Sequence, residues 1–447
     1  MDYKELYDKK LITAEDAANM VNDGDWVDLG WAALIPQEFD KALAARANEL
    51  QDVKIRSGIA TYPLNVTQAD FTGEHFIYHS YFSTAAERPF IEKNKYGAFH
   101  TCARYGEAGI LYSSVTERSR VFVIQARPMD KHGNFNFGIA TSHTREIMEN
   151  SDCVIIEVNE NVPRALGGSY NFVNIKDVDY IIESSNYPMR TIPRAQFDHY
   201  ELDVARNVMS ILQDRDCIQL GIGGLPNAIG SEIVNSDLKD LGVHSEMYVD
   251  AFMDLTKAGK ISGKYKSRDK GRQVYAFAGG TAELYEFIDD NEELMATSVD
   301  YVNDVATISS IDNFVSVNNA ISVDLWGQVS SETVGTRHIS GTGGALDFML
   351  GAYKSRGGRS VVALLSSKVD SEGNRYSNIM PTLPLGTQAT ATRSTVQYVA
   401  TEYGIVNLKG RSAWQRAELL ISLAHPELRD ELIQQADEMG MWRNSNK

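Results

Sequence analysis

Two short glycine-rich segments have residue types and spacing that could support catalysis. The first is Gly221-Ile-Gly-Gly-Leu-Pro-Asn-Ala228, and the second is Thr342-Gly-Gly-Ala345. Each lies between a strand-like and a helical pattern. There, glycine lets backbone N–H groups approach a ligand, and a helix N-terminus favours negative charge. Both segments fit an anion or oxyanion site, and equally a tight strand-to-helix turn. Pro226 replaces the third glycine of GxGxxG, which argues against a dinucleotide site.

A single acidic residue, Glu246 in His244-Ser-Glu-Met-Tyr-Val-Asp250, is a further residue that could carry chemistry. From the residues alone, an exposed carboxylate at a strand end is the simpler interpretation. Glu246, Asp250 and Asp254 could line one helix face as ligands for a hard cation. The extended pattern of residues 246–249 argues against that, so no metal site is predicted. The chain contains no HExxH, Walker-type or GxSxG motif.

Two basic groups interrupt a chain whose net charge is −17. Lys257–Arg272 carries seven cationic side chains and one acid, Asp269, while Lys354, Arg356 and Arg359 form a smaller group. This local reversal suggests a polyanion such as a nucleotide phosphate group. A solvated surface loop is the commoner origin of such a charge run, and it is slightly favoured for Lys257–Arg272.

Length and composition limit the class of protein. The 447 residues are enough for two domains, and the acidic balance argues against nucleic acid or an anionic membrane as partner. The three cysteines lack zinc spacing and fit a reducing compartment. The N-terminal residues do not resemble a secretory signal, and no apolar run approaches the ~20 residues that span a bilayer. A cytoplasmic protein is expected.

Short β-rich apolar runs alternate with helical patterns, which favours an α/β fold with mostly parallel sheets. The predicted strands are Trp26–Leu29, Val121–Ala126, Val154–Val158, Cys217–Leu220, Phe314–Val317 and Val361–Leu365. The predicted helices are Ala14–Val21, Pro36–Ala47, His143–Asn150, Val204–Leu212, Asn227–Val234 and Trp414–Ala424.

A long internal repeat indicates that the chain is duplicated. Three segments match in the same order: Asn22–Gly30 with Gln213–Gly221, Asp52–Arg56 with Gly242–Glu246, and Val121–Gly133 with Val315–Gly327. Convergence of two α/β domains on similar turns is the alternative, but ordered matches at nearly constant offset favour duplication.

The repeat predicts two similar domains, residues 1–190 and 200–447, divided within Ser184–Asp203. The second copy has a glycine loop where the first has the bulkier Gly30–Pro36, and it has Glu246 where the first has Arg56. We therefore expect the chemistry to have specialised in the second half.

The two glycine-rich segments and the segment around Glu246 resemble motifs of family I CoA-transferases. Two further segments share this resemblance: Glu157-Val-Asn-Glu-Asn-Val-Pro163 and Asn319-Ala-Ile-Ser-Val-Asp324. The resemblance is strongest to the butyryl-CoA:acetate and 4-hydroxybutyrate CoA-transferase group, which includes acetyl-CoA hydrolases. It covers nearly the whole chain. It implies two similar open α/β domains, related to the ribose-5-phosphate isomerase type of fold, with the active site between them.

The resemblance also implies roles for individual residues. Glu246 would be the nucleophile, and the N–H groups near Gly344 and the carboxamide of Asn303 would serve the oxyanion. Beside Asn303, Val305 departs from the family pattern, which usually has proline there. Ala345 stands where glutamine is common, so the acyl pocket is expected to differ. The implied CoA-binding residues are Gly221, Ile222, Gly223, Gly224, Leu225, Ile321, Gly344 and Lys368.

The implied reaction is a ping-pong exchange between acyl-CoA and a carboxylate. Attack by the Glu246 carboxylate gives a glutamyl-acyl anhydride, and the released CoA thiolate converts it to a glutamyl-CoA thioester. A carboxylate nucleophile keeps the intermediates activated, which a serine ester would not. Each tetrahedral oxyanion needs nearby donors, and the anhydride must be protected from water.

The expected activity is butyryl-CoA:acetate CoA transfer. The alternatives are an acyl-CoA hydrolase on the same scaffold, a 4-hydroxybutyrate CoA-transferase, and a non-catalytic CoA-binding protein, against which the intact motifs argue. The expected partners are acyl-CoA and short-chain carboxylates, with no permanently bound cofactor, no metal, no nucleic acid and no membrane. A homo-oligomer, dimer or tetramer, is expected.

Overall fold

The computed structural model describes residues 2–446, which form two compact units. The first unit comprises the chain up to Pro193, together with Glu246–Tyr248 and Val274–Val302. The second comprises Arg194–Ser245, Val249–Gln273 and the chain from Asn303 onward. No helix within residues 2–446 has both the length and the apolar character needed to cross a membrane.

The first unit is built on a seven-stranded sheet in the order β4-β3-β2-β1-β5-β7-β9, in which each neighbouring pair is parallel. Its central strands β5 and β7 are buried at every position, which explains their continuous apolar runs. The strands are β1 Trp26–Leu29, β2 Val53–Ser57, β3 Phe76–Ser80, β4 Ala98–His100, β5 Val121–Ala126, β7 Val154–Val158 and β9 Tyr180–Glu183. A separate antiparallel pair joins β6 Asn134–Asn136 and β8 Phe172–Asn174.

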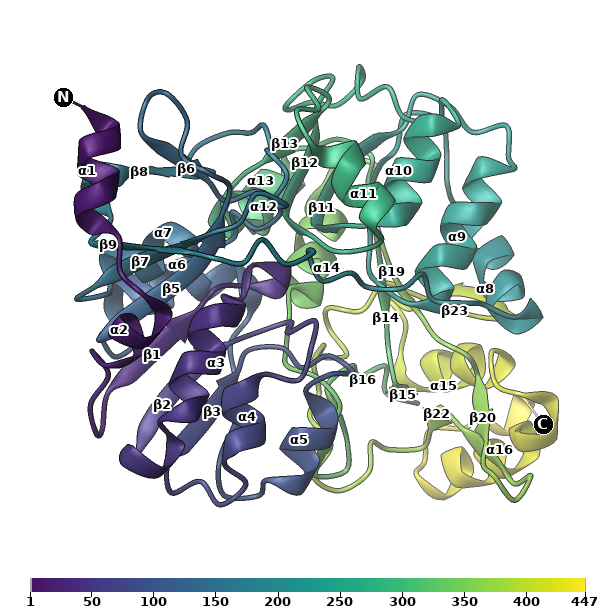
Figure 1. The fold of residues 1–447 in the computed structure, drawn as a ribbon. Coiled ribbons are helices and arrows are strands. Elements are labelled where there is room, and N and C mark those ends of the chain that lie inside the picture. Colours follow the sequence, from purple (N-terminus) through teal and green to yellow (C-terminus); the bar gives the residue numbers. More distant parts are fainter. Residues whose placement is uncertain (1, 447) are drawn as a thin grey trace. The chain divides into compact units, whose positions relative to one another are not determined.

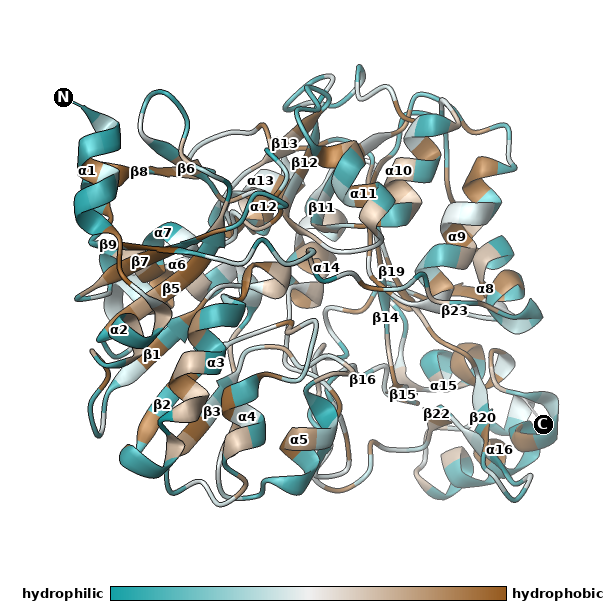
Figure 2. Cartoon of the chain, viewed as in Figure 1, coloured by the Kyte–Doolittle hydropathy of each residue, from teal (hydrophilic) through white to brown (hydrophobic). Residues whose placement is uncertain are grey.

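Helices cover both faces of this sheet, because right-handed crossovers from β1 toward β4 and from β5 toward β9 emerge on opposite sides. Helices α2, α3 and α4 lie together on one side, and α6 and α7 lie on the other (Figure 1). Figure 2 shows β5, β7 and β9 in the hydrophobic colour and α1 largely in the hydrophilic colour. The helices are α1 Tyr3–Lys10, α2 Ala14–Ala18, α3 Gln37–Ala45, α4 Asn65–Ala69, α5 Arg88–Lys93, α6 Ala108–Ser114, α7 Thr144–Glu149, α11 Ala282–Ile288 and α12 Val299–Val302.

The second sheet has eight strands in the order β13-β12-β11-β10-β14-β19-β23-β24. From β11 to β24, all neighbouring strands are parallel except β23 and β24, which are antiparallel. Strand β11 runs through the division between the units, since Gly242–Ser245 belong to the second and Glu246–Tyr248 to the first. The strands are β10 Cys217–Leu220, β11 Gly242–Tyr248, β12 Gln273–Ala278, β13 Leu294–Ala296, β14 Phe314–Asn319, β19 Arg359–Ala363, β23 Tyr398–Thr401 and β24 Gly404–Asn407.

The second unit adds helices and small strands around this sheet. A separate core forms beneath α15 and α16, with Val323, Leu364 and Leu420 among its buried side chains. The helices are α8 His199–Met209, α9 Gly224–Val234, α10 Asp250–Lys257, α13 Val305–Ser309, α14 Ala345–Lys354, α15 Ala413–Ser422 and α16 Arg429–Glu438. The small strands are β15 Ser322–Asp324, β16 Val329–Ser330, β17 Thr333–Val334, β18 Arg337–His338, β20 Ser367–Val369, β21 Arg375–Ser377 and β22 Ile379–Met380.

The strand register confirms the duplication. The sequence repeat aligns Val27 with Ile218 and Val121 with Val315. In the structure Val27 pairs with Val121, and Ile218 pairs with Val315. The order β2-β1-β5-β7 of the first sheet also matches β11-β10-β14-β19 of the second. The two sheets are therefore built alike from the same chain order.

The predicted match of Arg56 with Glu246 is wrong by two residues. Val27 pairs with Ile55 and Ile218 with Val243, so Arg56 corresponds to His244. Asp52 and Asp240, equivalent in this register, both have φ of 58°. Glu246 instead corresponds to Gly58, just beyond β2. The ungapped comparison missed the offset because the loops preceding β2 and β11 differ in length.

Candidate functional site

The two glycine segments lie at the carboxyl edge of the second sheet. The first glycine loop, Gly221–Gly223, follows β10 and leads into α9. Strand β14, next to β10, ends at Asn319, whose Nδ2 donates to the carbonyl of Ile222 at 3.2 Å. The chain order of the strands reverses between β10 and β14. Such a switch point, at the carboxyl ends of parallel strands, is where open α/β sheets bind ligands.

Backbone geometry and packing require two of these glycines. Gly223 has φ of 117°, which an L side chain rarely adopts. At Gly224, a Cβ would lie 2.3 Å from Oε1 of Glu201 on α8. At Gly221, the nearest atom would be Cγ of Pro226 at 4.0 Å, so that side of the loop has room. Ile222 is exposed and Leu225 is buried.

The segment Ser330–Glu332 joins the first glycine loop to the second. The N–H of Ile321 donates to the carbonyl of Ser330 at 2.8 Å, and the hydroxyl of Ser331 donates to the carbonyl of Asn319 at 3.0 Å. On its other side, Thr342 Oγ1 donates to the Glu332 carboxylate at 3.1 Å. Gly344 then forms the N-cap of α14. A series of hydrogen bonds thus links the segments that carry Gly221–Gly224, Ile321 and Gly344.

Three predicted site residues lie outside this group of contacts. Asn303 is buried directly after α12, and Asp304 caps the next helix, α13. Lys368 is exposed on the β20–β21 hairpin, and among residues 2–446 it takes no part in the contacts just described. Glu246 is half-buried on β11, between the buried Ser245 and Met247. The extended backbone of Glu246, of the rest of β11 and of Val249 confirms the prediction for residues 246–249.

The helix that follows the first strand is capped in the first unit by a carboxylate. The side chain of Glu157, fully buried on β7, accepts hydrogen bonds from the N–H groups of Glu38 at 3.3 Å and Phe39 at 3.0 Å, both in the first turn of α3. Its third donor is the hydroxyl of Tyr187. Burial raises the pKa of Glu157 to about 7, against the opposing effect of these three donors.

The equivalent helix in the second unit, α9, has no such carboxylate. Gln125 pairs with Glu157 in the first sheet, and Asn319 pairs with Ala363 in the second. The duplicated register makes Asn319 equivalent to Gln125, which likewise donates to carbonyls of its loop. Ala363 therefore stands in the place of Glu157. Within residues 2–446, no side chain accepts a hydrogen bond from the first N–H groups of α9, although the carboxylate of Glu201 lies beside Gly224.

The basic groups lie at the opposite edge of the second sheet. Lys266 is buried, and its Nζ donates to the carbonyls of Val243 at 2.9 Å and Arg272 at 2.7 Å, near the start of β11. Arg359, at the start of β19, pairs with Asp216, which directly precedes β10. Parallel strands start at one edge and end at the other. Lys266 and Arg359 therefore support the amino edge of the sheet, away from the glycine loops at its carboxyl edge.

Two open α/β sheets of the same order, with joined glycine loops at a switch point and a half-buried glutamate on the neighbouring strand, define a CoA-transferase type of enzyme. The structure of RipA from Yersinia pestis superposes with a TM-score of 0.90 at 32% identity, covering 99% of this chain and 100% of that one. Profiles of the acetyl-CoA hydrolase/transferase N-terminal and C-terminal domains match residues 1–193 and 280–436. The chain belongs to the acetyl-CoA hydrolase/transferase family.

Two relatives resemble the chain over its whole length. The butyryl-CoA:acetate CoA-transferase of Anaerostipes caccae is 48% identical over 448 residues and covers 100% of both chains. A probable butyrate:acetyl-CoA coenzyme A-transferase of Syntrophomonas wolfei is 48% identical over 443 residues, covering 99% of this chain and 98% of its own.

Proposed function

We propose that the protein transfers CoA between butyryl-CoA and acetate by a ping-pong mechanism with Glu246 as nucleophile. The relatives at 48% identity support this substrate pair. The observation that carries the proposal is the N-terminus of α9, whose first N–H groups have no side-chain acceptor within residues 2–446. It has Ala363 where the equivalent helix of the first unit has a carboxylate, and it lies beside Ile222, Asn319 and the second glycine loop.

In the proposed reaction, the Glu246 carboxylate attacks the thioester carbonyl of butyryl-CoA, and CoA thiolate leaves. The thiolate then attacks the glutamyl carbonyl of the resulting anhydride, which releases butyrate and leaves CoA as a thioester on Glu246. Acetate attacks this thioester and the two steps run in reverse, forming acetyl-CoA. The N–H groups at Gly344 and the carboxamide of Asn303 would stabilise the oxyanions. The segment Gly221–Leu225, Ile321 and Lys368 would hold CoA.

The test measures CoA species by mass after incubation with butyryl-CoA, with and without acetate. Acetyl-CoA that appears only with acetate, in step with loss of butyryl-CoA, supports transfer. Free CoA that accumulates without acetate would instead indicate a hydrolase. If neither appears across a panel of short-chain acyl-CoA substrates, the proposed activity is refuted.

The nucleophile is tested on intact protein. Incubation with butyryl-CoA alone is expected to add the mass of CoA to a peptide that contains Glu246, because the thioester waits for an acceptor acid. Glu246→Ala is expected to lose both this adduct and turnover. Glu292→Ala, at an exposed glutamate of the first unit, is the matched control and keeps both. An adduct that persists in Glu246→Ala would assign the nucleophile elsewhere.

A further inference from the structure

The conformation of the second glycine loop suits the binding of an anion. Gly343 has φ of 62°, and the next residue, Gly344, has φ of −104° and ψ of 8°. A left-handed residue followed by a right-handed one turns successive N–H groups toward the same side, which makes a small hollow that binds anions. Within residues 2–446, the N–H groups of Gly343, Gly344 and Ala345 have no hydrogen-bond acceptor. They are therefore available to a ligand, provided that the loop keeps this conformation.

Glu332 holds the chain that leads into this loop. Its carbonyl accepts hydrogen bonds from the N–H groups of Ile339 at 2.7 Å and Ser340 at 3.2 Å, which closes the base of the β17–β18 hairpin. Its carboxylate accepts a hydrogen bond at 3.1 Å from the hydroxyl of Thr342, the residue before Gly343. Glu332 thus contacts three of the four residues that precede Gly343.

Glu332 is itself anchored at the carboxyl edge of the second sheet through its neighbour Ser331. The N–H of Ser331 donates to Oγ1 of Thr390 at 3.0 Å, and its hydroxyl donates to the carbonyl of Asn319, the last residue of β14, at 3.0 Å. The loop, by contrast, is rich in glycine, whose backbone has the most conformational freedom to lose. The Glu332 carboxylate therefore links an anchored segment to a loop that needs an external restraint.

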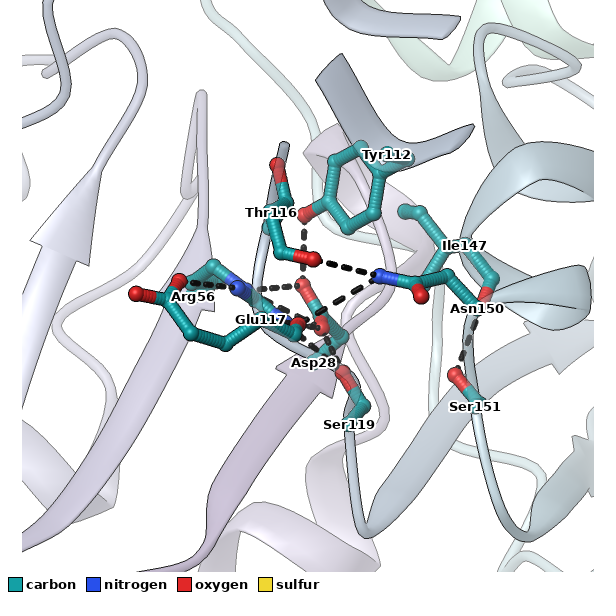
Figure 3. Close-up of polar contacts among 9 residues, drawn as sticks. All are labelled: Asp28, Arg56, Tyr112, Thr116, Glu117, Ser119, Ile147, Asn150 and Ser151. Atoms are coloured by element: carbon teal, nitrogen blue, oxygen red, sulfur yellow. Dashed lines mark hydrogen bonds and ion pairs between the residues drawn. The ribbon is translucent and has the colours of Figure 1, made fainter. Parts of the chain in front are cut away.

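The surroundings of Glu332 differ from those of a carboxylate that supports the core. Asp28 of the first unit is 1% exposed, forms an ion pair with Arg56 and accepts hydrogen bonds from the hydroxyls of Tyr112 and Ser119 (Figure 3). Removal of the cation from such a pair leaves an uncompensated buried charge and strongly destabilises a fold. Glu332 is only half-buried, and within residues 2–446 its carboxylate accepts a single hydrogen bond and forms no ion pair. A variant at Glu332 is therefore expected to fold.

We propose that Glu332 is a positioning residue, which acts through Thr342 to hold the N–H groups of Gly343 and Gly344 where they can stabilise the oxyanion of the reacting thioester. The inference deepens the proposed function and rests on it. An N–H group lowers the energy of an oxyanion only if it already points at the place where the charge develops. A displacement of about 1 Å is enough to lose much of that effect. No proton is transferred, because Glu332 acts only as a hydrogen-bond acceptor.

The kinetic test uses Thr342→Val, which keeps the shape of the side chain and removes the hydroxyl. We expect kcat to fall about 10-fold with KM for butyryl-CoA changed less than about twofold, because a hydrogen bond to a charged group is lost and the substrate contacts remain. Thr342→Ser retains the hydroxyl and is expected to keep kcat within about threefold. An unchanged kcat in Thr342→Val would overturn the proposal.

The matched control removes a threonine hydroxyl that supports the other end of the same hairpin. Oγ1 of Thr387 accepts a hydrogen bond from the N–H of Gly335 at 2.8 Å, at the tip of the β17–β18 hairpin. Thr387→Val is the same isosteric change, and it is expected to keep kcat within about twofold. Equal losses in Thr342→Val and Thr387→Val would refute the positioning role, because they would indicate general loosening of the hairpin.

Variants of Glu332 separate the effect of position from that of charge. Glu332→Ala is expected to lower kcat about 10-fold, whereas Glu332→Gln, whose side-chain carbonyl can still accept from Thr342, recovers most of that loss. In Thr342→Val/Glu332→Ala the two effects should not add, because Glu332 acts only through Thr342. Additive losses, or a Glu332→Gln variant as impaired as Glu332→Ala, would contradict the proposal.

A measurement without turnover separates this inference from the proposed reaction. Hydrogen exchange is followed by mass spectrometry in peptides that span residues 337–346, in which the N–H groups of Ile339 and Ser340 are hydrogen-bonded to Glu332. Thr342→Val is expected to raise the exchange rate there by at least about threefold, and Thr342→Ser is not. Unchanged exchange in Thr342→Val refutes the restraint even if the enzyme transfers CoA. Faster exchange supports it even if butyryl-CoA is not the substrate.

Discussion

Replacing Glu157 by glutamine is expected to remove a pH dependence from the stability of the first unit. Burial raises the pKa of Glu157 from 4.5 to about 7, so the folded state holds this proton more tightly than the unfolded state. Below pH 4.5 the carboxyl is protonated in both states and costs nothing. As pH rises toward 7, only the unfolded state loses the proton readily, so stability falls. For these two pKa values the loss between pH 5 and pH 8 is about 2.5 kcal/mol.

Glu157→Gln removes this pH dependence. Between pH 5 and pH 8, the stability of the variant therefore rises by about 2.5 kcal/mol relative to that of the wild type. Hydrogen exchange of α3 peptides measures the gain, because intrinsic exchange rates cancel when both proteins are compared at one pH. The ratio of protection factors is expected to change about 70-fold across this range. Glu160→Gln, at an exposed acid of the same segment, is the control and shows no such change. A flat ratio for Glu157→Gln would refute the buried, protonatable cap.

Three further changes test the second unit. Ala363→Glu places a carboxylate where Glu157 lies in the first unit, and it is expected to weaken CoA binding at least 10-fold by calorimetry relative to the isosteric Ala363→Gln. Gly223→Ala forces an L side chain to φ of 117° and is expected to cost roughly 1–2 kcal/mol of unfolding free energy by thermal denaturation, whereas Gly221→Ala, which has room for a Cβ, costs less. Arg359→Ala leaves Asp216 buried without its cation and is expected to destabilise the fold by about 3–5 kcal/mol, yet to leave the Kd for CoA of the folded protein unchanged. Weaker CoA binding by Arg359→Ala would instead place this basic group at the ligand site.

Hydrophobic runs predicted the centre of each sheet well. The predicted strands Trp26–Leu29, Val121–Ala126, Val154–Val158 and Cys217–Leu220 are confirmed at both ends, because central parallel strands are apolar along their whole length. Val361–Leu365 is displaced by two residues from β19, whose first residue is Arg359. A charged strand start that pairs with Asp216 carries no apolar signal.

Helix ends and polar partners were harder to predict. Helix α8 begins at His199, five residues before the predicted Val204, because Asp198 and Glu201 form a capping box ahead of the apolar stripe. Glu157 was recognised only as part of a motif, since nothing nearby in sequence shows that it caps α3.

Glu157 caps α3 in the first half, and the second half has no equivalent carboxylate. The stability of the two halves of this duplicated chain therefore depends differently on dissolved anions. In the first half, the side chain of Glu157 already accepts hydrogen bonds from the first turn of α3. The second half has Ala363 at that point, so the first N–H groups of α9 stay available to an external anion. If CoA binds there, saturation at 100 times Kd would add about 2.7 kcal/mol to the second half alone. Without CoA, proteases would then cleave the second half first, and the lifetime of the protein would depend on the concentration of its own substrate.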